Sequence, residues 1–329
     1  MFRHLRSLSS PTFAVCLGFV SGTCLAGDIV ILCGQSNASG RVSQGYEALP
    51  GDAAIPFHYD TDGPVWFRAS SAGWTTLHPI PETGVYGPEI AMGRHLAGAG
   101  WAPCVIKVSR GSTSLAENWH NNDGGGEMWD LWQSEVRDAL GSLEADGATI
   151  RAIVWMQGEN DATRLEWSDS YAANLKKLRG DMLQYLASLG WNSSSTLFVC
   201  GRVLDNQPHS AEVRLAQTQQ EVAVDTDDLN TLDGVHYDAD SVAVLGTRFA
   251  DAILAGTGTR LLDYALVAKP DPGGVLIRWR CPLDTTIALE TTADFLTWAP
   301  LVSEQVRVSV RMREINAADS MQVFRLSVR

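Results

Sequence analysis

Four short segments carry side chains with which an enzyme could cleave an ester. A serine esterase needs a nucleophile, a base that takes its proton, an acid that orients the base, and N–H donors for the oxyanion. Ser36 is the candidate nucleophile, because it directly follows an apolar run, and His236 is the candidate base. Asp233 lies three residues before His236. A turn can therefore bring its carboxylate to the imidazole Nδ1 and leave Nε2 for the Ser36 proton.

The oxyanion donors are expected from three places. They are the backbone N–H of Ser36, the backbone N–H of Gly111 and the side-chain amide of Gln157. Gly111 permits close approach because it has no side chain. A carboxamide such as Gln157 donates without titrating, and losing one oxyanion donor typically costs about 2.7–4 kcal/mol of transition-state stabilisation.

The same residues admit other interpretations. Gln35, Ser36 and Asn37 would also suit a polar turn that caps a helix, and a lone histidine is often a surface residue. Three acids around His236 (Asp233, Asp238, Asp240) suggest a metal loop, but their spacing lacks the EF-hand pattern. The chain contains no CxxC or HExxH motif. We therefore predict neither a metal site nor a cofactor.

A glycosidase is a further alternative, since Glu159 and Asp161 are two acids close in sequence. Two residues apart on one turn, they do not flank a scissile bond from opposite sides of a cleft. The sequence therefore favours ester cleavage over glycoside cleavage.

Taken together, the four segments resemble one known family. Gly34–Asn37, Arg110–Thr113, Trp155–Glu159 and Asp233–His236 are similar to the motifs of the sialate O-acetylesterase-like and carbohydrate esterase family 6 branch of the SGNH hydrolases. The resemblance covers about residues 28–255 and keeps the order of the motifs. It implies a Ser36–His236–Asp233 triad, oxyanion donors at Gly111 and Gln157, and supporting hydrogen bonds from Gln35, Asn37 and Glu159.

Two departures from this family leave the substrate open. Arg110-Gly111-Ser112-Thr113 stands where relatives often have a Gly-Gly-Thr-like run, and Ala38 replaces a larger apolar residue. Trp119 and His120 lie in a loop that we expect near the site. Trp119 is either a platform for a sugar ring or a residue that packs under its own loop.

The elements that must position these residues are alternating strands and helices. Ile29–Leu32 has no polar alternation, which is typical of a strand covered on both faces. Further strands are predicted over 103–108, 150–156 and 195–203, and helices over 87–96, 128–143, 167–189, 210–223 and 241–254. Residues 38–86 are predicted to be largely irregular. This alternation predicts a three-layer, flavodoxin-like α/β fold with a parallel sheet, whose strand ends share one edge.

Three regions are expected. Residues 1–26 have a basic start, an apolar segment over 12–20 and small residues before Gly27, which is typical of a secretory signal peptide. Residues 27–258 would form the esterase domain. Residues 259–329 would form a small β-sandwich-like accessory domain, with strands over 274–281, 286–291, 306–312 and 322–328, acting as a spacer or in sugar binding.

The net charge limits the classes of binding partner, and the cysteines bear on disulfide formation. A formal net charge of -13 without a Lys/Arg cluster argues against nucleic acid or an anionic membrane as partner, and suits a neutral substrate such as a sugar ester. After removal of residues 1–26, Cys33, Cys104, Cys200 and Cys281 remain. They are either buried thiols or, because export permits disulfides, partners such as Cys33 with Cys104 or Cys200.

These observations predict a secreted or periplasmic serine esterase that removes O-acetyl groups from acetylated xylan, sialic acid or a related glycan. Two alternatives stay open. One is a lipase- or thioesterase-like SGNH enzyme with a long apolar channel. The other is a non-catalytic carbohydrate-binding protein that retains the hydrolase fold.

Overall fold

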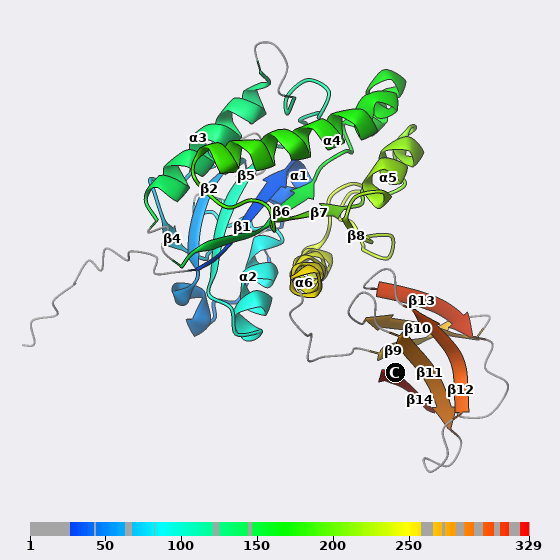
Figure 1. Ribbon diagram of the computed structural model, residues 1–329. Helices are drawn as coiled ribbons and strands as arrows, with labels where there is room; N and C mark the ends of the chain where they lie inside the picture. The colour runs from blue at the N-terminus through cyan, green and yellow to red at the C-terminus, as the bar shows by residue number, and fades with distance from the viewer. Residues whose placement is uncertain are drawn as a thin grey trace, which may run out of the picture.

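The computed structural model describes residues 27–257 except 43, 63–67, 82, 121–124 and 144–146, and the backbone of six strands between residues 266 and 328. One eight-stranded sheet forms the centre, in the order β3-β2-β5-β1-β6-β7-β8, with β4 paired to β2 (Figure 1). The strands that run parallel are β1 (Asp28–Gly34), β2 (Pro56–Asp62), β5 (Pro103–Ser109), β6 (Thr149–Met156), β7 (Leu197–Gly201) and β8 (Val222–Val224). Short β3 (Arg68–Ser70) and β4 (Thr75–Thr76) run antiparallel to β2.

Strand β1 lies inside the sheet, between β5 and β6. Its residues 29–33 are completely buried, which agrees with the apolar run that predicted it. The order β5-β1-β6-β7-β8 is the flavodoxin-like order 2-1-3-4-5, in which the chain crosses from one side of the first strand to the other. Ligands bind beyond the strand ends at such a switch point, and Ser36 follows the end of β1.

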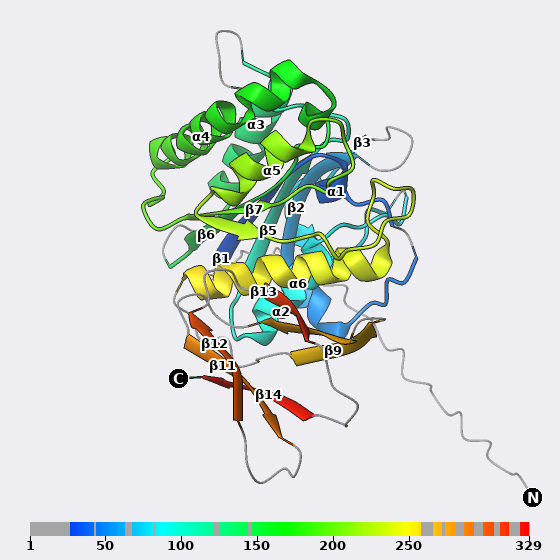
Figure 2. The same ribbon diagram turned by 90° about the vertical axis from the view of Figure 1, so that its right-hand side faces the viewer.

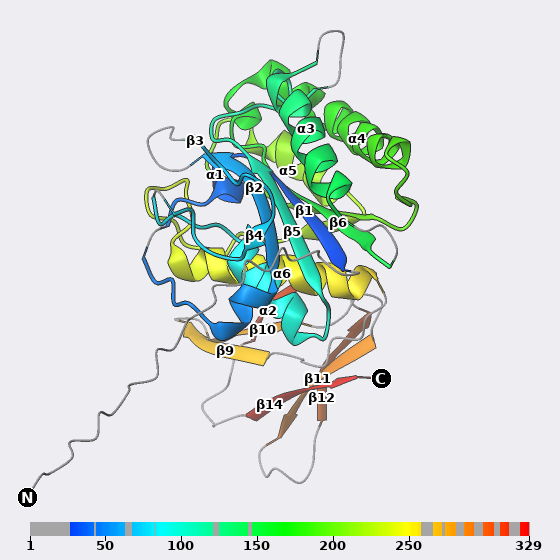
Figure 3. The same cartoon turned by 90° about the vertical axis from the view of Figure 1, so that its left-hand side faces the viewer.

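Helices cover both faces of the sheet and complete three layers. One face carries α2 (Glu89–Gly98) and α6 (Ala239–Gly256), which pack against each other (Figures 1 and 2). The other carries α3 (Glu127–Gly141), α4 (Leu165–Ser188) and α5 (Ser210–Thr218) (Figures 1 and 3). Shorter turns are α1 (Ser36–Ser39), η1 (Pro50–Ala54) and η3 (Asp161–Thr163). The predicted three-layer α/β class is confirmed.

Two sequence predictions about this sheet are wrong. Residues 38–86 are not one irregular connection, because they contain the buried strand β2. Polar residues interrupt its apolar pattern, and they have partners in other elements: His58 Nε2 lies 3.0 Å from Glu135, and Asp60 accepts three hydrogen bonds from Arg68. The helix predicted over 210–223 is α5, and it ends at Thr218 because residues 222–224 pair with β7 as strand β8.

Cys33, Cys104 and Cys200 are buried free thiols. Cys104 lies opposite Ile29 in the β1–β5 register, four residues from Cys33 along β1, and β6 separates β1 from β7, which carries Cys200. The suggested Cys33 disulfides are therefore wrong, and the buried-thiol alternative holds for these three residues. Cys281 lies outside the described residues.

The chain beyond residue 265 is described as strands only. Strands β9 (Leu266–Asp271), β10 (Gly274–Arg280) and β13 (Val310–Ile315) form one antiparallel sheet. Strands β11 (Thr286–Thr292), β12 (Ala299–Gln305) and β14 (Val323–Val328) form another. The predicted β character is confirmed, although β9 and β12 were not expected.

The expected signal peptide, residues 1–26, lies outside the described part of the chain. Within the described part, no helix has both the length and the apolar character needed to cross a bilayer.

Candidate active site

Ser36 begins helix α1 where β1 leaves the sheet. The turn requires glycine before it: Gly34 has φ 146°, and a Cβ at this position would lie 2.0 Å from the Met156 carbonyl oxygen. Ser36 is 4% exposed. Within the described chain, neither its backbone N–H nor its Oγ hydrogen-bonds to a protein group. Both atoms are thus available to a substrate.

Asp233 and His236 form the pair that their spacing predicted. Asp233 Oδ2 lies 2.7 Å from His236 Nδ1, and Asp233 Oδ1 accepts bonds from the backbone N–H groups of Val235 at 3.0 Å and His236 at 2.8 Å. Desolvation raises the pKa of Asp233, but these bonds and the His236 charge outweigh it and lower the pKa to about 2. The imidazole is therefore oriented by a carboxylate, with Nε2 left for another partner.

Asn37, the residue after the candidate nucleophile, holds the His236 loop against α1. Its Nδ2 donates to the Val235 carbonyl at 3.1 Å, and its Oδ1 accepts from the Tyr237 N–H at 3.3 Å. The peptide groups on both sides of His236 are thus bonded to the residue next to Ser36. The described residues contain no hydrogen bond between Ser36 Oγ and His236 Nε2. In ligand-free enzymes such catalytic bonds are often long and form only with substrate.

Gly111 lies beside Ser36, as expected of an oxyanion donor, but its N–H already has an acceptor. A Cβ on Gly111 would lie 3.5 Å from Ser36 Cβ and 2.4 Å from Arg41 Nη2, so that a side chain here would require the Arg41 guanidinium to move. The Gly111 N–H donates to Asp62 Oδ2 at 2.8 Å. Asp62 is buried, and its other oxygen accepts from Ser39 Oγ at 2.7 Å. The oxyanion role of Gly111 stays a prediction, and it requires that Asp62 release this N–H.

Gln157 is completely buried and connects three segments. Its Nε2 donates to Asp161 Oδ2 at 2.6 Å, to the Thr113 carbonyl at 3.0 Å and to Gln35 Oε1 at 3.2 Å. Two amide hydrogens are already shared among three acceptors. Its oxyanion role also stays a prediction, since the amide would have to exchange one of these acceptors for the substrate oxygen.

Gln35 and Glu159, two of the three supporting candidates, hydrogen-bond to neighbouring segments of the site. Gln35 Oε1 accepts from the Gly158 N–H at 3.4 Å and the Asn160 N–H at 3.3 Å, so that it joins the ends of β1 and β6. Glu159 Oε1 accepts from Asn37 Nδ2 at 2.6 Å. Burial raises the pKa of Glu159, although the bond from Asn37 and the nearby His236 oppose this effect.

Asp161, Asp62 and Asn160 are site residues that sequence reasoning did not assign. Asp161 is buried, and besides Gln157 it accepts the backbone N–H groups of Leu115 at 2.8 Å and Ala116 at 3.0 Å. The Asn160 side chain donates to the Ser112 carbonyl at 3.0 Å. Ser112 itself has φ 59°, which is unusual for a residue other than glycine and often marks a functional turn. A local signal existed for Asn160 and Asp161, which belong to the Gln-Gly-Glu-Asn-Asp run, but not for Asp62.

Trp119 is not a sugar platform. It is completely buried, its Nε1 donates to Thr113 Oγ1 at 3.0 Å, and its ring lies edge-on to Trp155 with centroids 4.9 Å apart. The alternative that it packs under its own loop is therefore correct. His120 is half-buried, and its carbonyl accepts the Gly126 N–H at 2.8 Å. Substrate contact by His120 stays a prediction.

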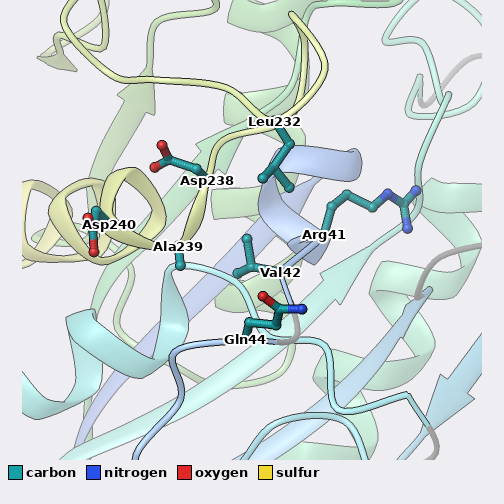
Figure 4. A pocket seen from close by; sticks show the side chains of 7 residues that line it. All are labelled: Arg41, Val42, Gln44, Leu232, Asp238, Ala239 and Asp240. Atoms are coloured by element: carbon teal, nitrogen blue, oxygen red, sulfur yellow. The ribbon is translucent and has the colours of Figure 1, made fainter.

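The structure also contains a pocket of about 430 Å³ (Figure 4). Its lining comes from the segment after α1 and from the loop that carries the Asp233–His236 pair into α6. The lining residues are Arg41, Val42, Gln44, Leu232, Asp238, Ala239 and Asp240. Across the described ranges, no group of three His, Cys, Asp or Glu side chains is placed to bind a metal ion.

Comparisons with known proteins agree with this fold. The model of a carbohydrate esterase family, the sialic acid-specific acetylesterases, matches residues 26–255. A crystal structure of an Arabidopsis thaliana protein is similar with a TM-score of 0.55 and 20% identity, over 70% of this chain and 98% of that one. The structure of NanS is similar with a TM-score of 0.53 and 15% identity, over 71% and 98%. No curated protein matches in sequence.

Proposed function

Because the chain belongs to the sialic acid-specific acetylesterase family of carbohydrate esterases, we propose that it removes O-acetyl groups from carbohydrate through a Ser36–His236–Asp233 triad. The observation that best supports this triad is the Asn37 bridge. It bonds the peptide groups on both sides of His236 to the residue that follows Ser36. The histidine is thereby tied to the nucleophile turn although 200 residues separate them in the chain.

In the first half of the proposed reaction, Ser36 Oγ attacks the acetyl carbonyl carbon. His236 Nε2 takes the hydroxyl proton, and the Asp233 carboxylate stabilises the imidazolium through Nδ1. When the tetrahedral intermediate collapses, His236 returns the proton to the sugar oxygen. The deacetylated sugar leaves, and the acetyl group remains on Ser36 as an ester.

In the second half, water replaces the sugar. His236 removes a proton from the water as it attacks the acetyl-Ser36 carbonyl carbon, and then returns that proton to Ser36 Oγ. Acetate leaves and the free enzyme is restored. One ester bond is cleaved by one water, so that no metal or redox partner is needed for the balance of the reaction.

The oxyanion of both intermediates is proposed to bind first to the Ser36 N–H, which has no acceptor among the described residues. The Gly111 N–H would join it by moving from Asp62 to the substrate oxygen. Gln157 would contribute in a second way, by holding Gln35 and Asp161 in place around the turn.

The proposal also includes the location of the protein and its substrates. The basic, apolar and small-residue pattern of residues 1–26 supports a signal peptide and hence a secreted or periplasmic location. The family supports an acetylated sugar as substrate. Acetylated xylan, O-acetylated sialic acid and related glycans are the substrates proposed.

The first test measures acetate released from acetylated xylo-oligosaccharide, from O-acetylated sialic acid and from a small aryl acetate. We expect Ser36→Ala to lower kcat/KM by at least about 10³-fold on every substrate that the wild type cleaves, because the covalent step is lost. Ser195→Ala is the matched control. Ser195 is exposed and precedes β7, at the amino ends of the parallel strands, whereas Ser36 follows the carboxyl end of β1. Its loss should therefore leave the rate unchanged.

Circular dichroism shows whether each variant is folded. If folded Ser36→Ala retains the wild-type rate, another nucleophile carries the reaction and the triad is wrong. Release of acetate from none of the three substrates by folded wild type would refute the proposed function itself.

A further inference from the structure

Two residues that line the 430 Å³ pocket, Arg41 and Leu232, are neighbours of the candidate site. Arg41 lines one side of it, and a Cβ on Gly111 would lie 2.4 Å from Arg41 Nη2 and 3.5 Å from Ser36 Cβ. Leu232 lines another side, and its N–H donates to the His236 carbonyl at 2.7 Å. Two residues that line the pocket therefore contact the segments that carry the proposed catalytic residues.

The lining of the pocket is partly apolar and partly polar. Val42, Leu232 and Ala239 supply apolar surface, and Leu232 is one of the few large apolar residues that the described chain exposes. Gln44, Asp238 and Asp240 add groups that can accept hydrogen bonds. Such a pocket matches a sugar ring, which has an apolar face and hydroxyl groups around its edge.

The charges around the pocket are unequal. In Figure 4 the Arg41 guanidinium points away from Asp238 and Asp240, which lie on the other side. The Arg41 charge is opposed by the buried Asp62 carboxylate, 3.7 Å away. Asp238 accepts the Ser241 N–H at 2.8 Å as the N-cap of α6, and Asp240 is exposed in the first turn of that helix. The pocket therefore keeps an excess of negative charge.

From this lining we propose that the pocket is the sugar subsite of the enzyme and that it selects uncharged acetylated sugars over sugars that carry a carboxylate. This inference rests on the proposed esterase function and deepens it. Hydroxyl groups can donate to Asp238 and Asp240, whereas a sugar carboxylate would face two like charges. Each like charge at about 8 Å in a solvated site lowers the affinity for an anion by roughly threefold.

The test compares substrates that differ only in this charge. O-acetylated sialic acid and O-acetylated glucuronic acid are each supplied as the free carboxylate and as the carboxyl methyl ester, and only acetate is measured. At low ionic strength we expect kcat/KM to be about threefold to tenfold higher for the methyl esters. Raising the ionic strength to about 0.3 M should narrow this preference, since salt screens exposed charges.

Asp240→Asn identifies the source of the preference. It removes one charge from the pocket at nearly constant shape, and we expect it to reduce the ratio of ester to carboxylate kcat/KM by about threefold. Asp169→Asn is the matched control, because Asp169 is an exposed residue of α4, on the opposite face of the sheet. It should leave the ratio unchanged.

The outcomes separate this inference from the function on which it rests. If acetate is released faster from the carboxylates than from their methyl esters, or if Asp240→Asn and Asp169→Asn change the ratio equally, the selective subsite is wrong while the esterase stands. If the folded wild type releases acetate from no substrate, including acetylated xylo-oligosaccharide and a small aryl acetate, the esterase function itself fails.

Discussion

At the scale of single residues, the candidate site depends on polar groups that are held by more than one bond. Asp233 accepts three hydrogen bonds from two residues, all within its own turn. Asn37 uses both atoms of its amide to hold the chain around His236 and also donates to Glu159. Local bonds thus orient the imidazole, and long-range bonds bring it to α1.

The Asp233 carboxylate gives a prediction with a pH dependence. We expect Asp233→Asn to lower kcat by up to about 10⁴-fold, the loss seen when the triad acid of a serine protease becomes Asn. Because the Asp233 side chain is exposed, we take this decrease in kcat as an upper limit. Because folding lowers its pKa to about 2, the ionised group stabilises the fold above about pH 4, and this contribution is lost as pH falls towards 2.

Two measurements check this prediction. Acetate release gives kcat, with Asp169→Asn as the control for loss of one negative charge. The carboxyl carbon of Asp233, followed by NMR between pH 5 and 2, should titrate near 2. A midpoint near 4, or an unchanged kcat in the variant, would show that Asp233 does not hold the histidine.

At the scale of elements, helix α1 rests on a buried ion pair. Lys107 of β5 donates to the Ser39 carbonyl at the end of α1 at 2.8 Å, and its Nζ lies 2.8 Å from Glu89 Oε2 in the first turn of α2. Glu89 Oε1 in turn accepts the Gly87 N–H at 2.9 Å. Both charged side chains are completely buried. Burial lowers the pKa of Lys107, and Glu89 opposes this shift.

We expect Lys107→Met to reduce the free energy of unfolding by about 3–5 kcal/mol, because it leaves the Glu89 carboxylate buried without its partner. Adding Glu89→Gln should recover part of that loss, since both charges are then absent. Urea denaturation of the single and double variants measures the difference.

Lys177→Met is the control for this prediction. Lys177 pairs with Asp181 one turn along α4 at an exposed position, where such a pair contributes only about 0.3–0.5 kcal/mol. Equal losses in the Lys107 and Lys177 variants would mean that the buried pair does not support α1.

At the scale of the whole molecule, the described α/β elements and the family match all precede the C-terminal strands. The last strand of the central sheet is β8, the last helix among the described residues ends at Gly256, and the family match ends at residue 255. The proposed site residues all lie between Gln35 and His236. None of the residues to which we assign a chemical role lies in the β strands from residue 266 onward.

Removal of residues 259–329 tests this division of the chain. We expect the shortened protein to hydrolyse a small aryl acetate with kcat/KM within about threefold of the full chain, because every proposed catalytic group is retained. Its melting curve, compared with that of the full chain, reports whether the remainder is folded. A loss greater than tenfold in a folded protein would assign the C-terminal region to the active site.

The sequence by itself determined the fold class, and it predicted the order in which the segments of the candidate site follow one another. Apolar runs without alternation mark buried strands, and each run ends in polar residues at the same edge of a parallel sheet. The Asp233–His236 pair was also readable, because three residues span one turn. These features depend on local pattern, and local pattern is what a sequence displays directly.

The tertiary structure alone decided which polar groups are occupied and which segments join the sheet. Asp62 holds the Gly111 N–H across 49 residues, and Asn37 reaches Glu159 across 122. Strand β2 is buried in spite of its polar residues because side chains of other elements, Glu135 of α3 and Arg68 of β3, pair with them, and Trp119 is enclosed by the core. The reason is physical: a buried polar group must find a partner, and the fold, rather than the neighbouring sequence, determines which partner is within reach.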